Sequence, residues 1–316
     1  MIREAVAASL VRPTALVSVC DELRIPRSTV YAQRDDGRSK LLQKRGPKPL
    51  VPDSDLLTAI REVLTDPPFM GEGYRKVHAR LRYRGIHADV ERIRLLMREH
   101  DLQAPGKPRR ILGPRTHDGT IITLAPDEMW GTDATATMLL DGQQATIFGI
   151  YDHCTCELLG IHAALRADRF EAIVPLHQAC RASFGGVGKA IAAGLKLRHD
   201  RGSGSRSIAT GRTRMRPIAR GSQFISRAFQ AELRFLGMDA SPSFVRAPEG
   251  NGCIERFWRT LKEQLLWIHA FANIEDLNQA LQEFRDLYNH QWLIERHNHR
   301  PPALVRQDLL GAGDAA

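Results

Sequence analysis

The sequence predicts an α/β unit, a mixed β-sheet with helices on its faces, preceded by all-α units. From Met129 onward, short β-branched and partly alternating runs are separated by turn residues and then give way to alternating helix and strand patterns. Before that point, apolar residues recur at the three- and four-residue spacing of amphipathic helices. The excess of basic residues also lies in the front part, which indicates that the two parts have different roles.

The distribution of charge indicates a basic front and a balanced back. The chain has 316 residues and a formal net charge of +9. Residues 1–115 hold 23 Lys and Arg against 14 Asp and Glu, whereas residues 116–316 hold 22 of each. This asymmetry favours a nucleic-acid-binding region joined to a separate catalytic unit, although a solvated basic surface explains the charge equally well.

The sequence contains no apolar run of membrane-spanning length and no signal-peptide pattern, so we expect a soluble cytoplasmic protein. Its five cysteines are scattered and form no C-x-x-C pair, so we expect reduced thiols. The stretch His153-Cys154-Thr155-Cys156 has poor zinc-ligand spacing and falls in a strand pattern, which favours a structural role.

Residues 1–38 are predicted to be a helix-turn-helix DNA-binding segment. A helix over Ala15–Leu23 is followed by a tight turn and a second helix that Ser28 would cap. The second helix of such a motif enters a major groove with its first residues toward the bases, so Arg27 and Ser28 are candidate DNA contacts. Many helical hairpins share this local pattern.

Residues 39–54 are a predicted linker, residues 55–105 a helical DNA-binding domain, and residues 106–126 a second basic linker. Within the domain, helices are expected over 56–64, from Gly73, and over 89–102. An ordinary amphipathic helix would have the same pattern. The candidate DNA contacts are basic residues of the last two helices: Arg75, Lys76, Arg92, Arg94 and Arg98.

Residues 127–310 are predicted to form the α/β unit. Three sequential antiparallel strands lead into a helix, a fourth strand, a second helix, a short strand and two final helices. The expected ranges are 130–140, 143–153 and 156–167 for the three strands, then 169–183, 194–200, 223–236, 238–244, 252–268 and 274–289.

Three carboxylates lie where this pattern would bring chemistry together. Asp133 is within the first strand, Asp200 ends the fourth, and Glu255 is in the first turns of the helix after Asn251. Three converging carboxylates suit metal-assisted phosphoryl transfer, in which two divalent ions about 4 Å apart act on the attacking and leaving oxygens. Mg²⁺, or Mn²⁺ in its place, fits such oxygen ligands best.

The helix after Asn251 has two faces with different character. Glu255, Arg259 and Lys262 line up at i, i+4 and i+7, so that this face could meet metal and phosphate. A surface ladder of ion pairs would give the same spacing. The buried stripe is expected to comprise Ile254, Phe257, Trp258, Leu261 and Leu265.

Several motifs in a fixed order resemble one known family. They are WGTDAT, the aspartate of YDHCTCELLG, LRHD with RGSQF, PEGNGC-x-ERF, LKEQ and YNHQWLIERHNHRPPA, and the likeness extends forward to GYRKVHARLR. Together they resemble the insertion-sequence transposases with a retroviral-integrase-like catalytic core, and more narrowly the second-reading-frame proteins of a large bacterial element family. The likeness covers nearly the whole chain.

The resemblance implies an RNase H-like mixed sheet flanked by helices and a DDE triad of Asp133, Asp200 and Glu255 that holds the metal. It implies that Lys262 contacts DNA ends, and that Asp152 matches a recurrent aspartate outside the triad with a structural role. The implied activity is DNA transposition, with metal-dependent strand cleavage and strand transfer. The implied partners are terminal inverted repeats, target DNA, further copies of the chain and an upstream-frame helix-turn-helix protein, in or near a bacterial nucleoid.

An atypical insert separates the second and third carboxylates. The triplet RGS occurs at 201–203 and 220–222, so the offset is 220 − 201 = 19 residues. Between Asp200 and Glu255 lie 255 − 200 − 1 = 54 residues, and the spacing that the resemblance implies is shorter by that same 19. Removal of 201–219 would restore it.

The insert leaves two further interpretations open. The chain could bind DNA without catalysing, because the added residues start directly after a predicted metal ligand. A stand-alone RNase H-type nuclease would also fit the fold, but it would leave the basic helical units unexplained.

Overall fold

The computed structural model describes residues 16–22, 24–26, 28, 50–65, 67–106, 123–199, 223–242 and 252–313. The chain divides into two compact units, Met1–Leu50 and Val51–Ala316. In the first unit, α2 (Leu16–Glu22) matches the helix that the sequence predicts. Ser28 is helical and exposed. Arg27 and the remainder of the predicted second helix lie outside the described residues.

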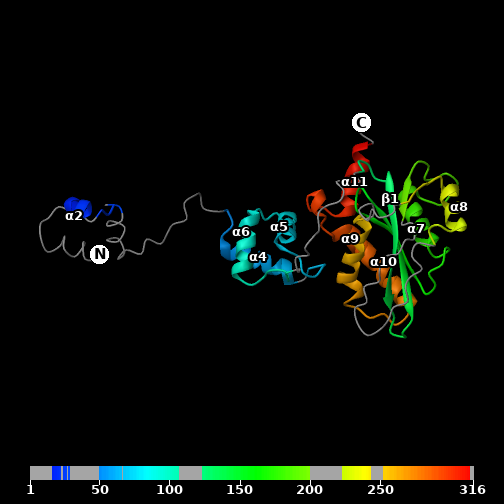
Figure 1. Cartoon of the computed structure of the whole chain (residues 1–316), viewed down its shortest axis with the longest axis horizontal. Coiled ribbons are helices and arrows are strands. Elements are labelled where there is room, and N and C mark those ends of the chain that lie inside the picture. The colour runs from blue at the N-terminus through cyan, green and yellow to red at the C-terminus, as the bar shows by residue number, and fades with distance from the viewer. Residues whose placement is uncertain are drawn as a thin grey trace. The chain divides into compact units, whose positions relative to one another are not determined.

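Three helices near the start of the second unit share a small core (Figure 1). They are α4 (Asp53–Thr65), α5 (Tyr74–Tyr83) and α6 (Val90–Glu99). The side chain of Asp89 caps α6 by accepting hydrogen bonds from the backbone N–H groups of Glu91 and Arg92, at 2.9 and 3.2 Å. The three helices confirm the helices expected from the periodicity of this segment.

A five-stranded sheet follows, in the order β3-β2-β1-β4-β5. β1 pairs antiparallel with β2 on one side and parallel with β4 on the other, β3 extends the antiparallel side, and β5 extends the parallel side. The strands are β1 (Met129–Met138), β2 (Gln144–Asp152), β3 (Leu158–Ala164), β4 (Lys196–His199) and β5 (Asp239–Pro242).

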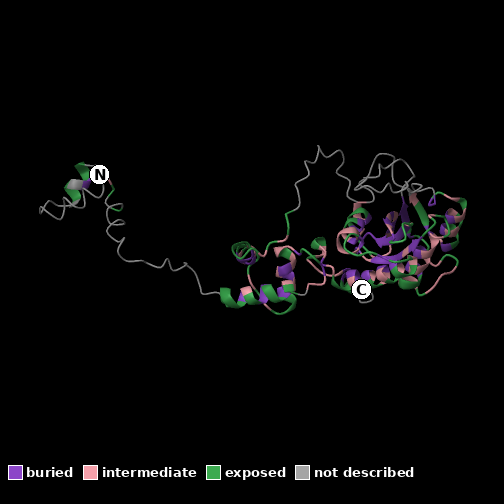
Figure 2. Cartoon of the chain, turned by 90° about the horizontal axis from the view of Figure 1, so that it is seen from below, coloured by how far each residue is buried: buried purple, intermediate pink, exposed green. Residues whose placement is uncertain are grey.

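Helices cover both faces of the sheet, and the buried residues gather between them and the strands (Figures 1 and 2). One face packs against α7 (Ile173–Phe184) and α8 (Arg227–Leu236). The other packs against α9 (Gly252–Leu261) and α10 (Ile274–Gln291). An antiparallel meander followed by two parallel strands, with helices on both faces, is the RNase H-like arrangement, so the predicted fold class is confirmed.

The helix that carries Glu255 changes its winding at Lys262. α9 continues as the π-helical turn η3 (Lys262–Leu266), which holds more residues per turn than an α-helix. The buried position after Leu261 is therefore Leu266, whereas Leu265 is only half-buried. The prediction of Leu265 in the buried stripe assumed an uninterrupted α-helical period.

Two further segments differ from the sequence prediction. The His153–Cys156 stretch was wrongly expected in a strand: residues 153–155 form the turn between β2 and β3, and Cys156 has a φ of 65°. The helix α11 (Pro302–Gly313) and the 3-10 turn η4 (Glu295–His297) were not predicted. All five cysteines are free thiols, as expected.

Amide side chains cover the outer backbone edge of β3. Asn289 bonds both the N–H and the C=O of Leu158, at 2.9 Å each, and Asn278 does the same for Ala163, at 2.8 Å each. Between them, Ile161 donates its N–H to Gln178 and accepts from Gln282. The edge strand is therefore hydrogen-bonded along its outer side by residues of α7 and α10.

Side chains also join the α4–α6 segment to the sheet's helices. Phe69 is buried in the same hydrophobic cluster as the buried residues of α10, and its ring centroid lies 4.8 Å from that of Trp292. The backbone of Met70 exchanges hydrogen bonds with the side chain of Gln264, at 2.8 and 3.1 Å. In the part of the chain that the structure describes, no helix is long and apolar enough to cross a membrane.

Candidate active site

Asp133 lies in the central strand of the sheet, on the face that α9 and α10 cover. It pairs with Gly149 of β2. Paired residues of neighbouring strands project to the same face, and the next odd-numbered residues of β2, Ile147 and Tyr151, both belong to the α9/α10 cluster. The carboxylate of Asp133 is half-buried, so the strand presents it toward α9 without sealing it from solvent.

Glu255 lies in the first turn of α9 and is exposed. Its neighbours Ile254 and Phe257 are buried against the sheet, which fixes the helix while leaving the glutamate accessible. An acidic residue in the first turn also interacts favourably with the positive end of the helix dipole. The predicted contrast between a buried and a polar face of this helix is therefore present in its first turns.

Lys262 connects the end of α9 to Asp133. Burial lowers the pKa of the Lys262 ammonium, and the carboxylate of Asp133 opposes that shift. The ammonium is half-buried and lies within electrostatic reach of Asp133. The fold thus brings Lys262 near enough to Asp133 for their charges to interact, although more than a hundred residues separate them in the sequence.

Asp200 lies outside the described residues. It follows His199, the last residue of β4, and β4 is paired in parallel with β1. Among the described residues, no three His, Cys, Asp or Glu side chains are grouped as metal ligands. The two predicted ligands that are described, Asp133 and Glu255, offer carboxylate oxygens, which is the donor chemistry that Mg²⁺ takes.

The predicted DNA contacts fall into two groups. Arg92 donates to Asp53 and to the carbonyl of Val51, at 2.7 and 2.6 Å, and Arg94 is paired with Glu91. Arg75 is paired with Glu295, and the Lys76 ammonium lies 3.0 Å from the centroid of the Trp292 ring. These four residues make contacts within the chain.

The other candidates lie on α6 and on the helix that carries Glu255. Arg98 on α6 is exposed, and so is Arg259 on α9, whose guanidinium is paired with Glu263 at 2.8 Å. Lys262 interacts electrostatically with Asp133. The assignment of all these residues to DNA contacts stays a prediction.

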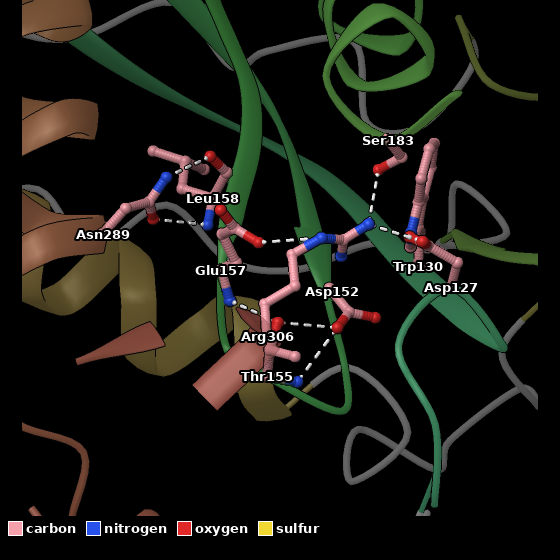
Figure 3. A network of polar contacts seen from close by, with 9 residues as sticks. All are labelled: Asp127, Trp130, Asp152, Thr155, Glu157, Leu158, Ser183, Asn289 and Arg306. Carbon is pink, nitrogen blue, oxygen red and sulfur yellow. Dashed lines mark hydrogen bonds and ion pairs between the residues drawn. The ribbon is translucent and has the colours of Figure 1, made fainter. Parts of the chain in front are cut away.

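A half-buried polar network fixes the start of β1 (Figure 3). Arg306 of α11 is paired with Asp127 and donates to Ser183 at 3.0 Å, and its Nε lies 3.5 Å from Glu157. Asp127 in turn accepts from the indole N–H of Trp130 at 2.9 Å, three residues before Asp133. The C-terminal helix therefore anchors the strand that carries the first predicted ligand, a role that sequence patterns did not reveal.

Asp152 has the structural role that was expected of it. Its carboxylate is fully buried and accepts from the N–H and the hydroxyl of Thr155, at 2.9 and 2.7 Å (Figure 3). Burial raises the pKa of this carboxyl group, and the bonds to Thr155 oppose the shift. The aspartate organises the turn between β2 and β3.

That turn is also held by a residue of the C-terminal motif. Arg296 donates to the carbonyls of His153 and Cys154, and its Nη1 lies 4.0 Å from the sulfur of Cys253, two residues before Glu255. The sequence contains Arg296 only as a letter of the motif YNHQWLIERHNHRPPA and predicts no role for it. Its neighbour in the turn, His153, is buried, and burial together with Arg198 and Arg296 lowers its pKa to about 4.

Comparison with known proteins finds relatives among insertion-element proteins. Residues 236–302, which include α9 and α10, match the integrase core domain. The chain is 24% identical over 243 residues to an uncharacterized 31.7 kDa protein of insertion element IS407 from Burkholderia multivorans, covering 77% of this chain and 78% of the relative. It is also 24% identical over 251 residues to the transposase InsD of insertion element IS2 from Escherichia coli, covering 76% of each.

A solved structure also aligns with the chain, at lower sequence identity. A simian T-cell lymphotropic virus intasome, solved in complex with a PP2A regulatory subunit, aligns with a TM-score of 0.44 and 16% identity, over 78% of this chain and 74% of that one.

Proposed function

We propose that this chain, which contains an integrase core domain and is related to insertion-element transposases, is a DNA transposase that cleaves DNA strands and joins them to new sites. Asp133, Asp200 and Glu255 are the proposed metal ligands. The proposed substrates are the terminal inverted repeats of an element and its target DNA. Further copies of the chain on the DNA, and an upstream-frame partner protein, belong to the same proposal, as does action at the bacterial nucleoid.

The register of the sheet carries the proposal. β1 and β4 pair Met129 with Lys196 and Gly131 with Arg198, a constant difference of 67 positions. The same difference of 67 relates position 133 to position 200, which supports the assignment of the two aspartates to one site. Since α9 packs on the face to which Asp133 projects, Glu255 would complete the set from the helix.

Each group then has a role in the reaction. The three carboxylates would hold two Mg²⁺ or Mn²⁺ ions, which supply a more acidic water and neutralise charge on the leaving oxygen. Lys262, beside Asp133, would bind a phosphate of the DNA end and hold the strand over the carboxylates. Arg259, one turn before it, would bind a neighbouring phosphate from the exposed face of α9.

Substitution of the three carboxylates tests this reaction. Asp133→Asn, Asp200→Asn and Glu255→Gln should each reduce Mg²⁺-dependent cleavage and joining of terminal-repeat DNA to below about a thousandth of the wild-type rate, with DNA affinity retained. Asp141→Asn, at the exposed β1–β2 hairpin, and Glu275→Gln, in the first turn of α10, are matched controls that should keep full activity. Strand transfer by any of the three site variants would refute the assignment.

The insert after Asp200 motivates a second candidate function, a transposase copy that binds DNA but is catalytically impaired. Its 19 added residues begin directly after a proposed ligand, which a metal site needs to hold within about half an ångström. Lengthening a loop costs only about 1 kcal/mol in closure entropy, so the added length by itself does not decide the matter.

A deletion distinguishes the two functions. The Δ201–219 chain, which restores the shorter spacing, and the full-length chain should be compared in one strand-transfer assay at equal DNA occupancy. Activity only in the deletion variant would support an impaired copy. Equal rates would show that the insert leaves the site intact.

A further inference from the structure

The strand residue opposite Asp133 is a glycine in an otherwise bulky strand. Gly149 is flanked in β2 by Phe148 and Ile150, both fully buried. A glycine inside a strand weakens it and marks a place where another group approaches closely. Here that group is the indole of Trp258 from α9.

The approach is tighter than an ordinary side-chain contact. A Cβ built on Gly149 would lie 3.0 Å from Cη2 and 3.2 Å from Cζ2 of Trp258, closer than ordinary van der Waals contact. Trp258 is 4% exposed and packs on Phe257, with ring centroids 5.2 Å apart. Its indole N–H is buried and has no hydrogen-bond partner among the described residues, so packing rather than a polar contact sets the depth of the ring.

The position of Trp258 connects this packing to the proposed site. It lies three residues after Glu255 and four before Lys262, so the two polar residues flank it by one helical turn on either side. Its ring rests on the partner residue of Asp133. The depth of the ring over Gly149 therefore sets how close α9 lies to β1.

We propose that Gly149 and Trp258 are positioning residues that set the separation between the carboxylates of Asp133 and Glu255, and thereby the geometry offered to a bound divalent cation. This inference rests on the proposed function. Neither residue contacts the cation or the DNA; each acts through the distance between strand and helix. A side chain at this position would require the ring of Trp258, or the helix that carries it, to shift by a few tenths of an ångström.

Metal selectivity is the measurement that a merely structural role would not change. Mg²⁺ demands near-ideal octahedral geometry with short bonds, whereas Ca²⁺ accepts flexible coordination at longer distances. In Gly149→Ala the helix or the ring must shift by a few tenths of an ångström. We expect the Kd for Mg²⁺ to rise about 10-fold and the Kd for Ca²⁺ to change less than about 3-fold, in line with the effect of groups that orient metal ligands.

The full-length protein is used, and each Kd is obtained from the rise in unfolding temperature as MgCl₂ or CaCl₂ is added. Trp258→Phe removes the ring atoms that the new methyl group would meet, so Gly149→Ala/Trp258→Phe should recover Mg²⁺ affinity relative to Gly149→Ala alone. Ala145→Val is the matched control, because it adds volume on the same strand and face, away from Asp133. It should lower the unfolding temperature without changing the ratio of the two Kd values.

The outcomes separate this inference from the proposed function. If the wild-type protein binds Mg²⁺ and Asp133→Asn abolishes that binding, the site stands, and an unchanged Mg²⁺/Ca²⁺ ratio in Gly149→Ala then overturns the positioning role alone. Failure of Trp258→Phe to restore the ratio in the double variant also overturns it. If the wild-type protein shows no Mg²⁺ binding that depends on Asp133, the proposed metal site and this inference fall together.

Discussion

His153 is a buried histidine that experiences the positive charges of two arginines. It is 2% exposed, and neither ring nitrogen has a hydrogen-bond partner among the described residues. Burial, and then the positive charges of Arg198 and Arg296, lower its pKa from 6.5 to about 4. The folded protein therefore keeps this ring neutral at a pH where the unfolded chain would protonate it.

The stability of the fold should consequently fall in mild acid. The folded pKa lies below the unfolded one, so this contribution is complete above pH 6.5 and is lost as the pH falls toward 4. Between pH 7.5 and pH 5 the loss amounts to about 2 kcal/mol in the free energy of unfolding. Denaturant titrations of wild type and His153→Gln at the two pH values measure it. The expected pH dependence is weaker in the variant by that amount, and parallel pH dependences would contradict the assignment.

At the level of residues, the sequence predicts the carboxylates of the proposed site but not the packing around them. Asp133 and Glu255 were identified from residue type and motif order. The close contact between Gly149 and Trp258 could not be predicted in this way, because it depends on the strand register and on the distance between α9 and the sheet. A glycine between Phe148 and Ile150 was nevertheless a readable signal of a close approach.

The helix α6 carries two kinds of arginine. Arg92 binds Asp53 and the carbonyl of Val51, so it fastens α6 to the start of α4. Arg98 is exposed near the other end of the same helix. The sequence pattern alone did not distinguish them, since both lie off the apolar stripe.

Alanine substitution should separate the two roles. Arg92→Ala is expected to lower the free energy of unfolding by about 1 kcal/mol, the scale of a partly exposed charge-assisted contact, in addition to any effect on DNA affinity. Arg98→Ala should leave stability within about 0.5 kcal/mol and weaken DNA binding at low salt. Chemical denaturation and fluorescence anisotropy with terminal-repeat DNA measure both. Equal stability losses would show that the contact with Asp53 contributes nothing.

Among the elements, long periodic helices and the three meander strands were predicted well, while changes of winding and late helices were not. The π-helical turn at Lys262–Leu266 moves the buried position by one residue, which a 3.6-residue period cannot anticipate. α11 begins at Pro302, a favourable first helical residue, but a run of two prolines also reads as a stop signal. Arg306 of α11 is paired with Asp127, which is far away in the sequence, so only the fold brings these two residues together.

At the scale of the whole unit, Phe69 joins a helical segment to the sheet's helices. Its ring is buried against Trp292 and Phe284. Phe69→Ala should lower the free energy of unfolding by about 3–5 kcal/mol, as for other buried aromatic residues. Tryptophan fluorescence during denaturation measures the loss, and Met70→Ala, next to it and 60% exposed, is the control. A loss below about 1 kcal/mol would mean that the contact with the sheet's helices is dispensable.

The amide-covered edge of β3 bears on how copies of this chain can meet. An open strand edge is a template for pairing with another chain and a starting point for aggregation. Here the N–H and C=O groups of Leu158, Ile161 and Ala163 already have side-chain partners, so an incoming strand would have to displace Asn289, Asn278, Gln178 and Gln282. These four side chains thereby hinder a second copy of the chain from adding its own strand to the sheet at this edge.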